Sequence, residues 1–357
     1  MTLLKDKTVL LTGGAGTVGR ELIKHILAEE PTDLRVIDNN ESEVFNLEEE
    51  FGRSYRGYSQ GDSPSSRMFH SYIGDVRDAD RLKRQMTGVD IVFHVAALKH
   101  VVLCEASPFD AVQTNIQGVK NVIDCALEAN VERVIFTSSD KAVNPTSVMG
   151  TSKLMGERLI SAANSMKMEH RTIFSSTRFG NVIGSRGSVV PIFYRQIKEG
   201  GPITLTDKDM TRFIMTIEES ARLVLKAAEL ARGGEVFVTK MEVIRIMDLA
   251  KAMIEMLDGK NSSIEIREIG TKPGEKLYEE LMTDEETSRA VELDELFSVL
   301  PAFRHVYKDI DYSYPGVRSE NVDNPYVSST STPMSIDEIK NYLETNKILE
   351  KIDLEGK

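Results

Sequence analysis

The sequence predicts an α/β protein with a doubly wound parallel sheet and a smaller, discontinuous C-terminal domain. In the first half of the chain, short runs rich in β-branched residues alternate with segments that have helical spacing. The runs are continuously apolar, which is typical of parallel strands covered by helices on both faces. Short right-handed crossovers between such strands give a doubly wound fold.

Each element follows from its own pattern. The run TVLLT begins the sheet, and RELIKHILAEE after it has apolar residues at helical spacing. Strands are expected at 8–12, 34–38, 90–96, 133–139 and 172–182, with helices at 20–30, 119–130 and 152–165. The later segments predict a helix at 188–200, a strand at 212–216, a helix at 218–231 and a strand at 235–239. The polar stretch 52–67 has no periodicity and is expected to be a surface loop.

The regularity of these elements also divides the chain. Residues 1–186 are expected to form the sheet domain, with return elements at about 212–239. Residues 187–330 mix shorter elements and are expected to form a smaller domain over the mouth of the sheet. Residues 331–357 predict a tail with one short amphipathic helix.

The bulk composition argues against several classes of protein. With 357 residues, 41% of them hydrophobic, the chain can bury a sizeable core. A net charge of −12 argues against nucleic acid, because phosphate binding needs a basic face. We see no secretion signal and no run of roughly 18 apolar residues, so we expect a cytoplasmic protein that does not enter a membrane. Cys104, in an expected loop, and Cys125, in an expected helix, are predicted to be buried free thiols.

The stretch TGGAGTVG at 12–19 lies between the first strand and the first helix. Gly13 allows the tight turn, Gly16 lets a pyrophosphate approach the backbone, and Gly19 lets helix and strand pack closely. The helix N-terminus, with Thr17 and Val18, then offers N–H groups to the anion. A dinucleotide site in a Rossmann domain is therefore predicted, with a simple glycine-rich turn as the alternative.

Asp38 ends the second strand, close to the offset of roughly 20 residues expected for an acid that binds a ribose. A carboxylate there accepts hydrogen bonds from the ribose hydroxyls and repels a 2′-phosphate, so NAD is favoured over NADP. Asp38 could instead only end its strand. The residues expected to contact NAD further along are Asn39, Asp75 and Val76 after the third strand, and Ala96 and Ala97 after the fourth.

A hydroxyl, an acid and a base follow the strand at 133–139, as Ser139, Asp140 and Lys141. The carboxyl end of a parallel strand is where open α/β sheets bind ligands, although an ordinary surface turn has the same letters. Lys153 lies on the next helix, which should pass beside the nicotinamide ribose; its alternative is a solvated lysine. Many nicotinamide enzymes have Tyr four residues before such a Lys, but here that position is Met149.

Taken together, these motifs resemble the extended short-chain dehydrogenase/reductase superfamily. More narrowly, they are similar to its UDP-N-acetylglucosamine 4,6-dehydratases of the polysaccharide-biosynthesis type. The similarity covers about residues 5 to 300 and rests on the following segments in this order: TGGAGTVG, the Asp–Val after the third strand, AALKH, TNIQGVKNVI, SSDKAVNPTSVMGTSK, RFGNVIGSRGSVVP, DMTRFIMTIEES and KPGEKLYEEL. In much of this family Met replaces the expected Tyr, which accounts for Met149.

The resemblance implies a lyase reaction without net redox change. The sugar is oxidised at C4, water is eliminated across C5–C6, and hydride returns to C6, so NAD stays bound between turnovers. This chemistry needs two acid–base groups, which a simple dehydrogenation does not. By analogy Lys141 is the base at C5, with a lowered pKa, and Asp140 is the acid toward O6. Ser139 is expected to bind the C4 hydroxyl, whose proton acceptor is left open between Asp140 and Lys153 (through water).

A UDP-sugar substrate requires cationic and amide groups in the smaller domain. By resemblance, Asn181 contacts the sugar–diphosphate and Arg212 lies near the pyrophosphate. The residues expected to contact the substrate are Lys99, Met149, Asn181, Arg186, Arg212 and Glu275. An ordinary structural role is an equal alternative for Lys99 and Glu275. No metal is predicted. Family resemblance further implies a homo-oligomer, either a dimer or a hexamer.

Two other functions remain open on this sequence. A nucleotide-sugar 4-epimerase would use the same fold but would need the Tyr rather than the Asp140–Lys141 pair. A non-catalytic NAD-binding regulator would keep the fold and lose the activity. The stereochemistry at C5, the exact sugar and the pathway are not encoded in any motif of the chain.

Overall fold

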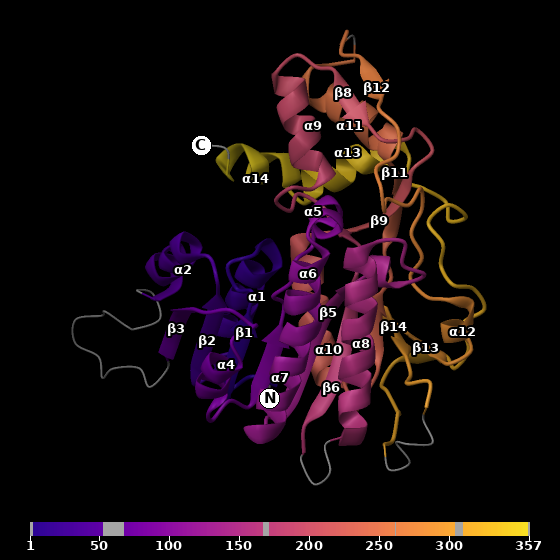
Figure 1. The fold of residues 1–357 in the computed structure, drawn as a ribbon. Helices are drawn as coiled ribbons and strands as arrows, with labels where there is room; N and C mark the ends of the chain where they lie inside the picture. Colours follow the sequence, from indigo (N-terminus) through magenta and orange to yellow (C-terminus); the bar gives the residue numbers. More distant parts are fainter. Residues whose placement is uncertain (1–2, 53–67, 167–170, 261, 304–309, 356–357) are drawn as a thin grey trace.

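The computed structural model describes residues 3–52, 68–166, 171–260, 262–303 and 310–355, and the predicted loop at 52–67 lies almost entirely outside them. The chain forms a large sheet domain with a smaller domain at the carboxyl ends of its parallel strands (Figure 1).

The central sheet has ten strands in the order β15-β13-β14-β10-β6-β5-β4-β1-β2-β3. The strands from β3 to β10 along this order pair in parallel, and the last three pair antiparallel at one edge. Their bounds are β1 Thr8–Thr12, β2 Asp33–Asp38, β3 Met68–Ile73, β4 Ile91–His94, β5 Arg133–Ser139, β6 Ile173–Phe179, β10 Val236–Thr239, β13 Ala290–Leu293, β14 Leu296–Val299 and β15 Val317–Ser319. The predicted doubly wound sheet is confirmed.

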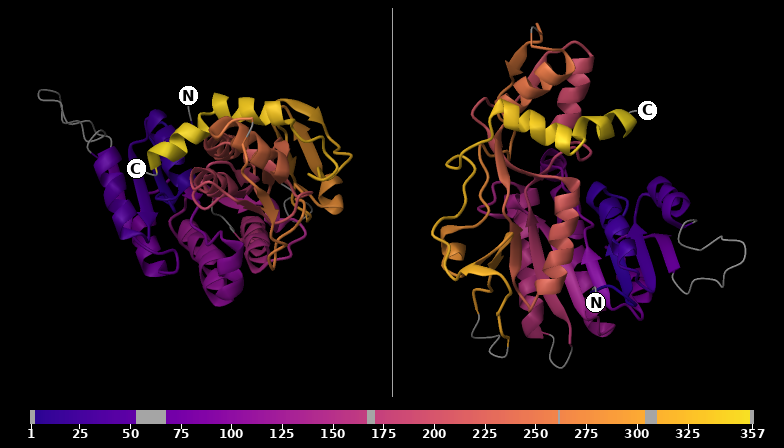
Figure 2. Two further views of the ribbon diagram at one scale, coloured as in Figure 1. Left: turned by 90° about the horizontal axis from the view of Figure 1, so that it is seen from above. Right: turned by 180° about the vertical axis from the view of Figure 1, so that it is seen from behind.

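Helices cover both faces of this sheet, which is why its central strands are largely buried and apolar (Figures 1 and 2). One face packs on α1 (Thr17–Ala28) and α10 (Ile217–Leu230). The other face packs on α4 (Ala79–Met86), α7 (Gly118–Glu128) and α8 (Val148–Met166). The remaining helices of this domain are α2 Glu41–Leu47, α5 Val101–Ala106, α6 Pro108–Ala111 and α12 Asp284–Thr287.

The smaller domain has its own hydrophobic core. Its helices are α9 Val189–Lys198, α11 Ile246–Leu257, α13 Ile336–Thr345 and α14 Ile348–Glu355. Its strands are β7 Asn181–Val182, β8 Ile203–Leu205, β9 Thr211–Met215, β11 Glu242–Arg245 and β12 Ile266–Glu268. They form a three-stranded sheet in the order β11-β9-β7 and the pair β12-β8.

Several elements differ from the sequence prediction. The C-terminal segment contains two helices instead of one, because Asn346 and Lys347 separate α13 from α14. The expected strand at 172–182 is divided at Gly180 between two sheets, and the strands at 290–319, placed with the smaller domain, extend the central sheet. Cys104 lies in α5 instead of a loop; both it and Cys125 are buried and free, as predicted.

Candidate active site

The site lies where the order of the central sheet reverses, between β1 and β4. At such a switch point the loops after neighbouring strands diverge and leave a crevice at the carboxyl ends. Residues 13–16 follow β1, residues 95–100 follow β4, and residues 140–142 follow β5 as a 3-10 turn. The predicted cofactor and catalytic motifs are therefore brought to one edge of the sheet.

The glycines of the turn are required by its close backbone packing. Gly13 has a φ of 74°, and a Cβ there would lie 2.5 Å from the backbone nitrogen of Ala96. A Cβ on Gly19 would lie 2.3 Å from the carbonyl oxygen of Gly13, so the close packing of helix and turn needs glycine. Gly16 precedes α1 and is open except for one atom at 3.3 Å, which leaves room for a ligand at the helix N-terminus.

Asp38 is held in this turn by backbone groups. Its Oδ2 accepts from the N–H of Ala15 at 3.0 Å, and its Oδ1 accepts from the N–H of Asn40 at 3.1 Å. The carboxylate thus lies beside the first turn of the cofactor site, where it would repel a 2′-phosphate. These features fit NAD, as the sequence predicts.

The other predicted cofactor residues, which follow the second and third strands, differ in exposure. Asp75 is bound by the guanidinium of Arg77, with the shorter contact at 2.6 Å, and this bond is the main reason that the pKa of Asp75 is lowered. Asn39, which is exposed, also hydrogen-bonds Asp75. Val76 is buried in the core, where its side chain packs closely against Gly118.

Thr17 and Val18 begin α1, next to the turn, and the Oγ1 of Thr17 accepts a long 3.5 Å hydrogen bond from a backbone N–H of the smaller domain. Ala96 contacts the turn through its backbone, and Ala97 follows it in the loop after β4.

The acid and base that follow β5 are in direct contact. Lys141 Nζ donates to Asp140 Oδ1 at 3.0 Å, and Ser139 Oγ donates to the same oxygen at 2.8 Å. Asp140 is fully buried, whereas about a quarter of the Lys141 side chain is exposed. The three predicted residues therefore form one hydrogen-bonded unit that opens outward at Lys141.

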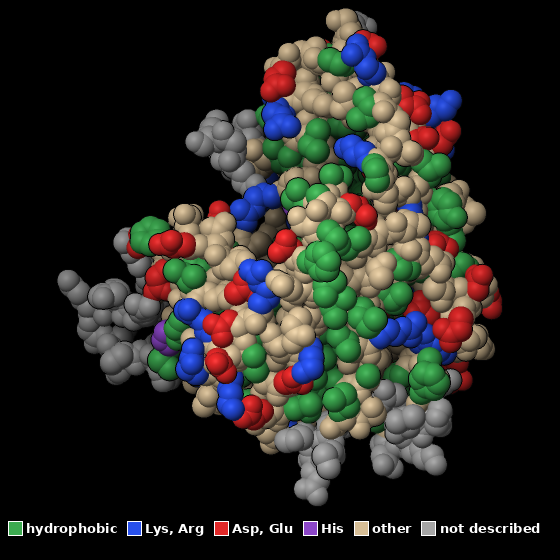
Figure 3. Space-filling model, viewed as in Figure 1, with side chains coloured by type: hydrophobic (Ala, Val, Ile, Leu, Met, Phe, Trp, Pro, Cys, Tyr) green, Lys and Arg blue, Asp and Glu red, His purple; other side chains and the backbone are tan. Residues whose placement is uncertain are grey.

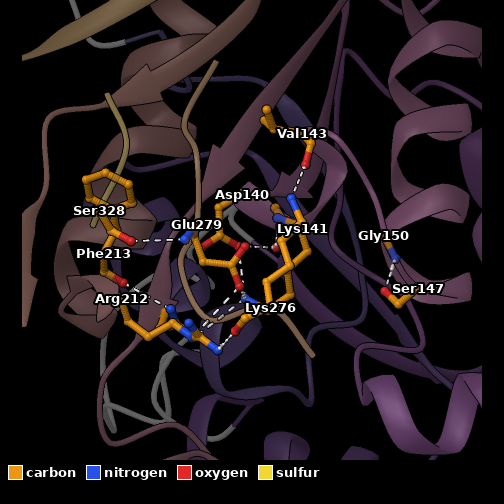
Figure 4. A network of polar contacts seen from close by, with 12 residues as sticks. Asp140, Lys141, Val143, Ser147, Gly150, Arg212, Phe213, Lys276, Glu279 and Ser328 are labelled. Carbon is orange, nitrogen blue, oxygen red and sulfur yellow. Dashed lines mark hydrogen bonds and ion pairs between the residues drawn. The ribbon is translucent and has the colours of Figure 1, made fainter. Parts of the chain in front are cut away.

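Glu279 completes this unit from a distant part of the chain (Figure 4). Its Oε1 lies 3.4 Å from Lys141 Nζ, and its backbone N–H donates to Ser328 Oγ at 2.9 Å. Among the described residues, Asp140 Oδ2 and Glu279 Oε2 are buried without a hydrogen-bond partner. Buried polar atoms are nearly always satisfied, so each of these two oxygens still has the capacity to accept a hydrogen bond.

The charges in this unit shift its protonation. Burial by itself lowers the pKa of Lys141, but the carboxylates of Asp140 and Glu279 outweigh it and hold the pKa above its ordinary value. The sequence-based expectation of a lowered pKa for Lys141 is therefore wrong, because the carboxylate of the adjacent Asp140, with that of Glu279, outweighs the effect of burial. Burial also raises the pKa of Glu279, against the opposing effect of the Lys141 ammonium.

Lys153 lies deeper, on α8. Its Nζ donates to the carbonyl oxygen of Thr137 at 2.8 Å and lies 4.8 Å from the centre of the Phe136 ring. Burial lowers its pKa to about 8. Met149, one turn earlier, packs in a small apolar cluster with Cys104 and does not line the cavity beside Lys141.

A cavity of about 550 Å³ adjoins the acid–base unit and extends into the smaller domain. Its charged and amide lining residues are Lys141, Asn181, Arg212, Lys272, Glu275, Lys276 and Glu279. Cationic groups thus outnumber carboxylates here despite the net charge of −12. The predicted residues Asn181, Arg212 and Glu275 meet in this cavity.

Arg212 also shapes the wall of the cavity. Its guanidinium donates to the carbonyl oxygens of Lys276 at 2.6 Å and Leu277 at 3.2 Å, and its Nε lies 3.8 Å from Glu279. Asn181 joins β7 to β9 through Phe213 and accepts from Lys141 at 3.4 Å.

The remaining two predicted substrate residues lie elsewhere. Arg186 donates to the carbonyl oxygen of Ala15 in the glycine-rich turn, and Lys99 donates to the carbonyl oxygen of Arg186. Neither lines the cavity, so the structure places both of them on the cofactor side.

Comparison with known proteins assigns the chain to a family. Residues 9–301 match the family described as "Polysaccharide biosynthesis protein". The chain belongs to this family. This match confirms the prediction from the sequence that the chain is an extended short-chain dehydrogenase/reductase of the polysaccharide-biosynthesis type.

Individual relatives place the chain among nucleotide-sugar enzymes of this family. An uncharacterized membrane protein of Methanocaldococcus jannaschii is 51% identical over 83% of this chain and 86% of its own length. The capsular polysaccharide biosynthesis protein CapD of Staphylococcus aureus is 41% identical over 79% of this chain, which spans only 46% of CapD. A UDP-glucose 4-epimerase of Rickettsia canadensis is 36% identical over 95% of this chain and 96% of its own.

Solved structures agree on the fold. The X-ray structure of Pen from Bacillus thuringiensis has a TM-score of 0.87 and 41% identity, and covers 97% of this chain and 99% of its own. DesIV of Streptomyces venezuelae, a dTDP-glucose 4,6-dehydratase, has a TM-score of 0.64 over 76% of this chain and 86% of its own, at 23% identity, which supports the fold alone. These findings support an enzyme of the dehydratase/epimerase type in polysaccharide biosynthesis. No helix within the described residues is long and apolar enough to cross a membrane.

Sequence reasoning missed Glu279, although it quoted KPGEKLYEEL and chose Glu275 from it. Glu275 accepts a 3.4 Å hydrogen bond from Thr206, whereas Glu279 reaches the acid–base pair. The sequence alone does not tell which of Glu275 and Glu279 contacts the residues after β5, because this depends on how the segment folds back toward that strand.

Proposed function

We propose that the protein is an NAD-dependent UDP-N-acetylglucosamine 4,6-dehydratase that forms a UDP-4-keto-6-deoxy sugar. The observation that carries the proposal is the contact of Asp140, Lys141 and Glu279 at the edge of the cofactor site. Elimination of water needs a base at C5 and an acid at O6, and this unit supplies both kinds of group next to a cation-lined cavity. Met149 in place of a Tyr favours a reaction that relies on this unit.

Oxidation of the C4 hydroxyl is the first requirement. Bound NAD would supply the hydride acceptor for C4 and the hydride donor for C6. Ser139 would hydrogen-bond the C4 hydroxyl and pass its proton to Asp140, to which it already donates at 2.8 Å. The Lys153 ammonium would favour the negative charge that develops on O4. We therefore assign Asp140, acting through Ser139, as the acceptor of the C4 hydroxyl proton, a role for which no Tyr is present.

Elimination then uses the remaining groups. The ketone at C4 makes the C5 hydrogen acidic, and Lys141 would remove it as a neutral amine. Because its pKa is raised, Lys141 must first transfer a proton, and Glu279 at 3.4 Å is the neighbour whose pKa is raised to receive it. Asp140, now protonated, would give its proton to O6 as water leaves. Lys141 would return a proton to C5 and recover its own from Glu279, which balances the cycle.

The cavity fits a nucleotide diphosphate. Lys272, Lys276 and Arg212 line it together with Asn181, so cations and an amide converge on the space beside Lys141. The choice of UDP and of the N-acetyl sugar rests on the resemblance of the sequence to that family.

Product mass tests this function. Purified protein incubated with UDP-N-acetylglucosamine should yield a product lighter by one water. A product of unchanged mass would instead support a UDP-sugar 4-epimerase, which the name of the Rickettsia relative favours. A protein that binds NAD and converts no UDP-sugar would support the regulator.

We also propose that the chain forms a homo-oligomer, either a dimer or a hexamer. In Figure 3, hydrophobic side chains gather over the helices between the two domains. Exposed hydrophobic residues on the helices of this part of the chain include Leu103 of α5, Phe109 of α6 and Met155 of α8, which are 64%, 83% and 45% exposed. A contiguous apolar surface of this kind marks an interface, and a second copy is the occupant we propose. Light scattering coupled to size-exclusion chromatography should give a mass of at least two chains, falling on Phe109→Asp.

A further inference from the structure

The loop at 183–187 makes contacts that neither proton transfer nor the substrate cavity requires. It connects β7 to α9 and reaches the glycine-rich turn. Arg186 donates from Nη2 to the carbonyl oxygen of Ala15 at 2.6 Å and from Nη1 to Glu43 Oε1 at 3.2 Å. A residue of the smaller domain is therefore bonded to the turn of the sheet domain that fits the cofactor.

The partners of Arg186 are held in place. Glu43, on α2, also accepts from Arg20 Nη2 at 2.8 Å, and this bond is the main reason that the pKa of Glu43 lies below its usual range. Glu43 therefore stays a carboxylate at neutral pH and keeps its ion pair with Arg186. Ala15 is the residue whose N–H donates to Asp38, so Arg186 and Asp38 bind the two backbone groups of one residue.

A second cation supports the loop. Lys99, which follows β4, donates from Nζ to the carbonyl oxygen of Arg186 at 3.1 Å. The Arg186 side chain itself is 50% exposed, so part of its guanidinium remains available to a ligand. Two cations thus lie beside the N-terminus of α1, where the diphosphate of a dinucleotide is expected.

We propose that Arg186 is a cofactor-retaining clamp, which closes over the dinucleotide by bonding the loop at 183–187 to Ala15 and Glu43. The proposal rests on NAD binding at the glycine-rich turn, as in the proposed function, but not on which reaction follows. Dissociation of NAD then requires the loop to lift from the turn. A cofactor whose hydride is returned in each cycle has no need to leave, so slow release suits this reaction.

The same loop also couples the two ligands. Gly187 and Ser188 line the substrate cavity directly after Arg186. A UDP-sugar that orders this part of the loop keeps Arg186 on the turn, so it tightens the binding of NAD by linkage, and it slows release because the loop must lift before NAD leaves.

The test measures NAD release without turnover. Holoenzyme is diluted into a trap that reduces or hydrolyses free NAD, and the rate of release is followed for wild type, Arg186→Ala, Arg186→Lys and Glu43→Gln. Losing charge-assisted hydrogen bonds should speed release from Arg186→Ala roughly 10- to 100-fold, with a smaller effect for Glu43→Gln. Arg195→Ala, an exposed arginine on α9, is the matched control and should release NAD at the wild-type rate. UDP should slow release from wild type but not from Arg186→Ala.

Two outcomes would overturn the clamp. One is wild-type release of NAD from Arg186→Ala together with a raised KM for the UDP-sugar, which would return Arg186 to the substrate role that the sequence suggested. The other is release from Arg195→Ala that is as fast as from Arg186→Ala. Either result leaves the proposed dehydratase intact, because product mass tests that reaction separately. Circular dichroism of Arg186→Ala verifies that any faster release comes from a folded protein.

Discussion

The two sides of the site are built in different ways. On the cofactor side, the turn after β1 and the end of β2 provide the glycines and Asp38 from segments close along the chain, and Arg186 is added from the distant loop at 183–187. On the reacting side, Asp140 and Lys141 depend on Glu279, which comes from another part of the chain. Local geometry fixes the first side. Charge compensation between distant segments sets the protonation of the second, so substitutions should affect the two sides separately.

The largest expected effect separates chemistry from cofactor binding. Lys141→Ala removes the base at C5 and should lower kcat by roughly 10³-fold, since general acid–base groups contribute about 10²- to 10⁴-fold. It should also stop solvent exchange at C5 while NAD content stays at the wild-type level. Lys208→Ala, an exposed lysine, is the control. Full activity in Lys141→Ala would remove Lys141 from the mechanism.

Arg178 joins strand β6 to helices α8 and α12, and its removal should destabilise the fold. It is buried in β6, forms two hydrogen bonds each to Glu157 of α8 and Glu286 of α12, and donates to the carbonyl oxygen of Leu281. Arg178→Met leaves the buried carboxylates of Glu157 and Glu286 without their shared guanidinium, although Glu286 keeps the N–H of Thr283, so the free energy of unfolding should fall by about 3–5 kcal/mol. Urea unfolding measures it, and a loss under about 1 kcal/mol would contradict this role.

Glu279→Gln should change the chemistry with little change in the fold. Removing this carboxylate takes away one of the two charges that raise the pKa of Lys141, so that pKa should fall. We expect kcat to drop about 100-fold, because the proton of Lys141 loses its acceptor. Glu285→Gln, at an exposed glutamate of α12, should be unaffected. A wild-type pH profile and kcat in Glu279→Gln would exclude Glu279 from the unit.

The pH dependence reports on Lys153. Its pKa in the fold is about 8, below the ordinary 10.5, so the ammonium is present below pH 8 and is lost as the pH rises through that value. If the charge assists oxidation at C4, kcat should fall above about pH 8 while the protein stays folded. Stability itself should rise between pH 8 and 10.5, since the unfolded chain binds the additional proton there. An activity that stays level to pH 9.5 would contradict the role of Lys153.

Met149→Tyr should have the smallest effect. Met149 packs with Cys104 and Ala111 away from the cavity, so a Tyr there meets apolar neighbours. We expect kcat within about threefold of wild type and a destabilisation of about 1–3 kcal/mol from overpacking. Steady-state kinetics and thermal unfolding measure the two effects. Complete inactivation would show that the shape of Met149 is part of the site.

The sequence predicted one side of the molecule better than the other, for a physical reason. The glycines of the turn, Asp38 and the parallel strands depend on local backbone geometry and on burial on both faces, which appear directly in the letters. The strands at 290–319 give no such signal, because short antiparallel edge strands have weak patterns. The helices α2, α4 and α11 were also not predicted.

In the site, too, local features could be predicted from the sequence and contacts between distant segments could not. Ser139, Asp140 and Lys141 are adjacent in the sequence and were recognised together. The role of Glu279, the raised pKa of Lys141 and the position of Arg186 on the cofactor side all depend on contacts between distant segments. Such contacts follow from the packing of the two domains, which no single stretch of residues specifies.

The most direct test of the account follows hydrogen through one turnover. UDP-N-acetylglucosamine carrying deuterium at C4 is incubated with holoenzyme in ordinary water, and the same unlabelled substrate is incubated in deuterium oxide. The account predicts a product lighter by one water, with the C4 deuterium found at C6 in the first case and solvent deuterium at C5 in the second. Proton NMR also assigns retention or inversion at C5. Conversion with no water lost and no exchange at C5 would contradict the assignment of Asp140, Lys141 and Glu279 to elimination.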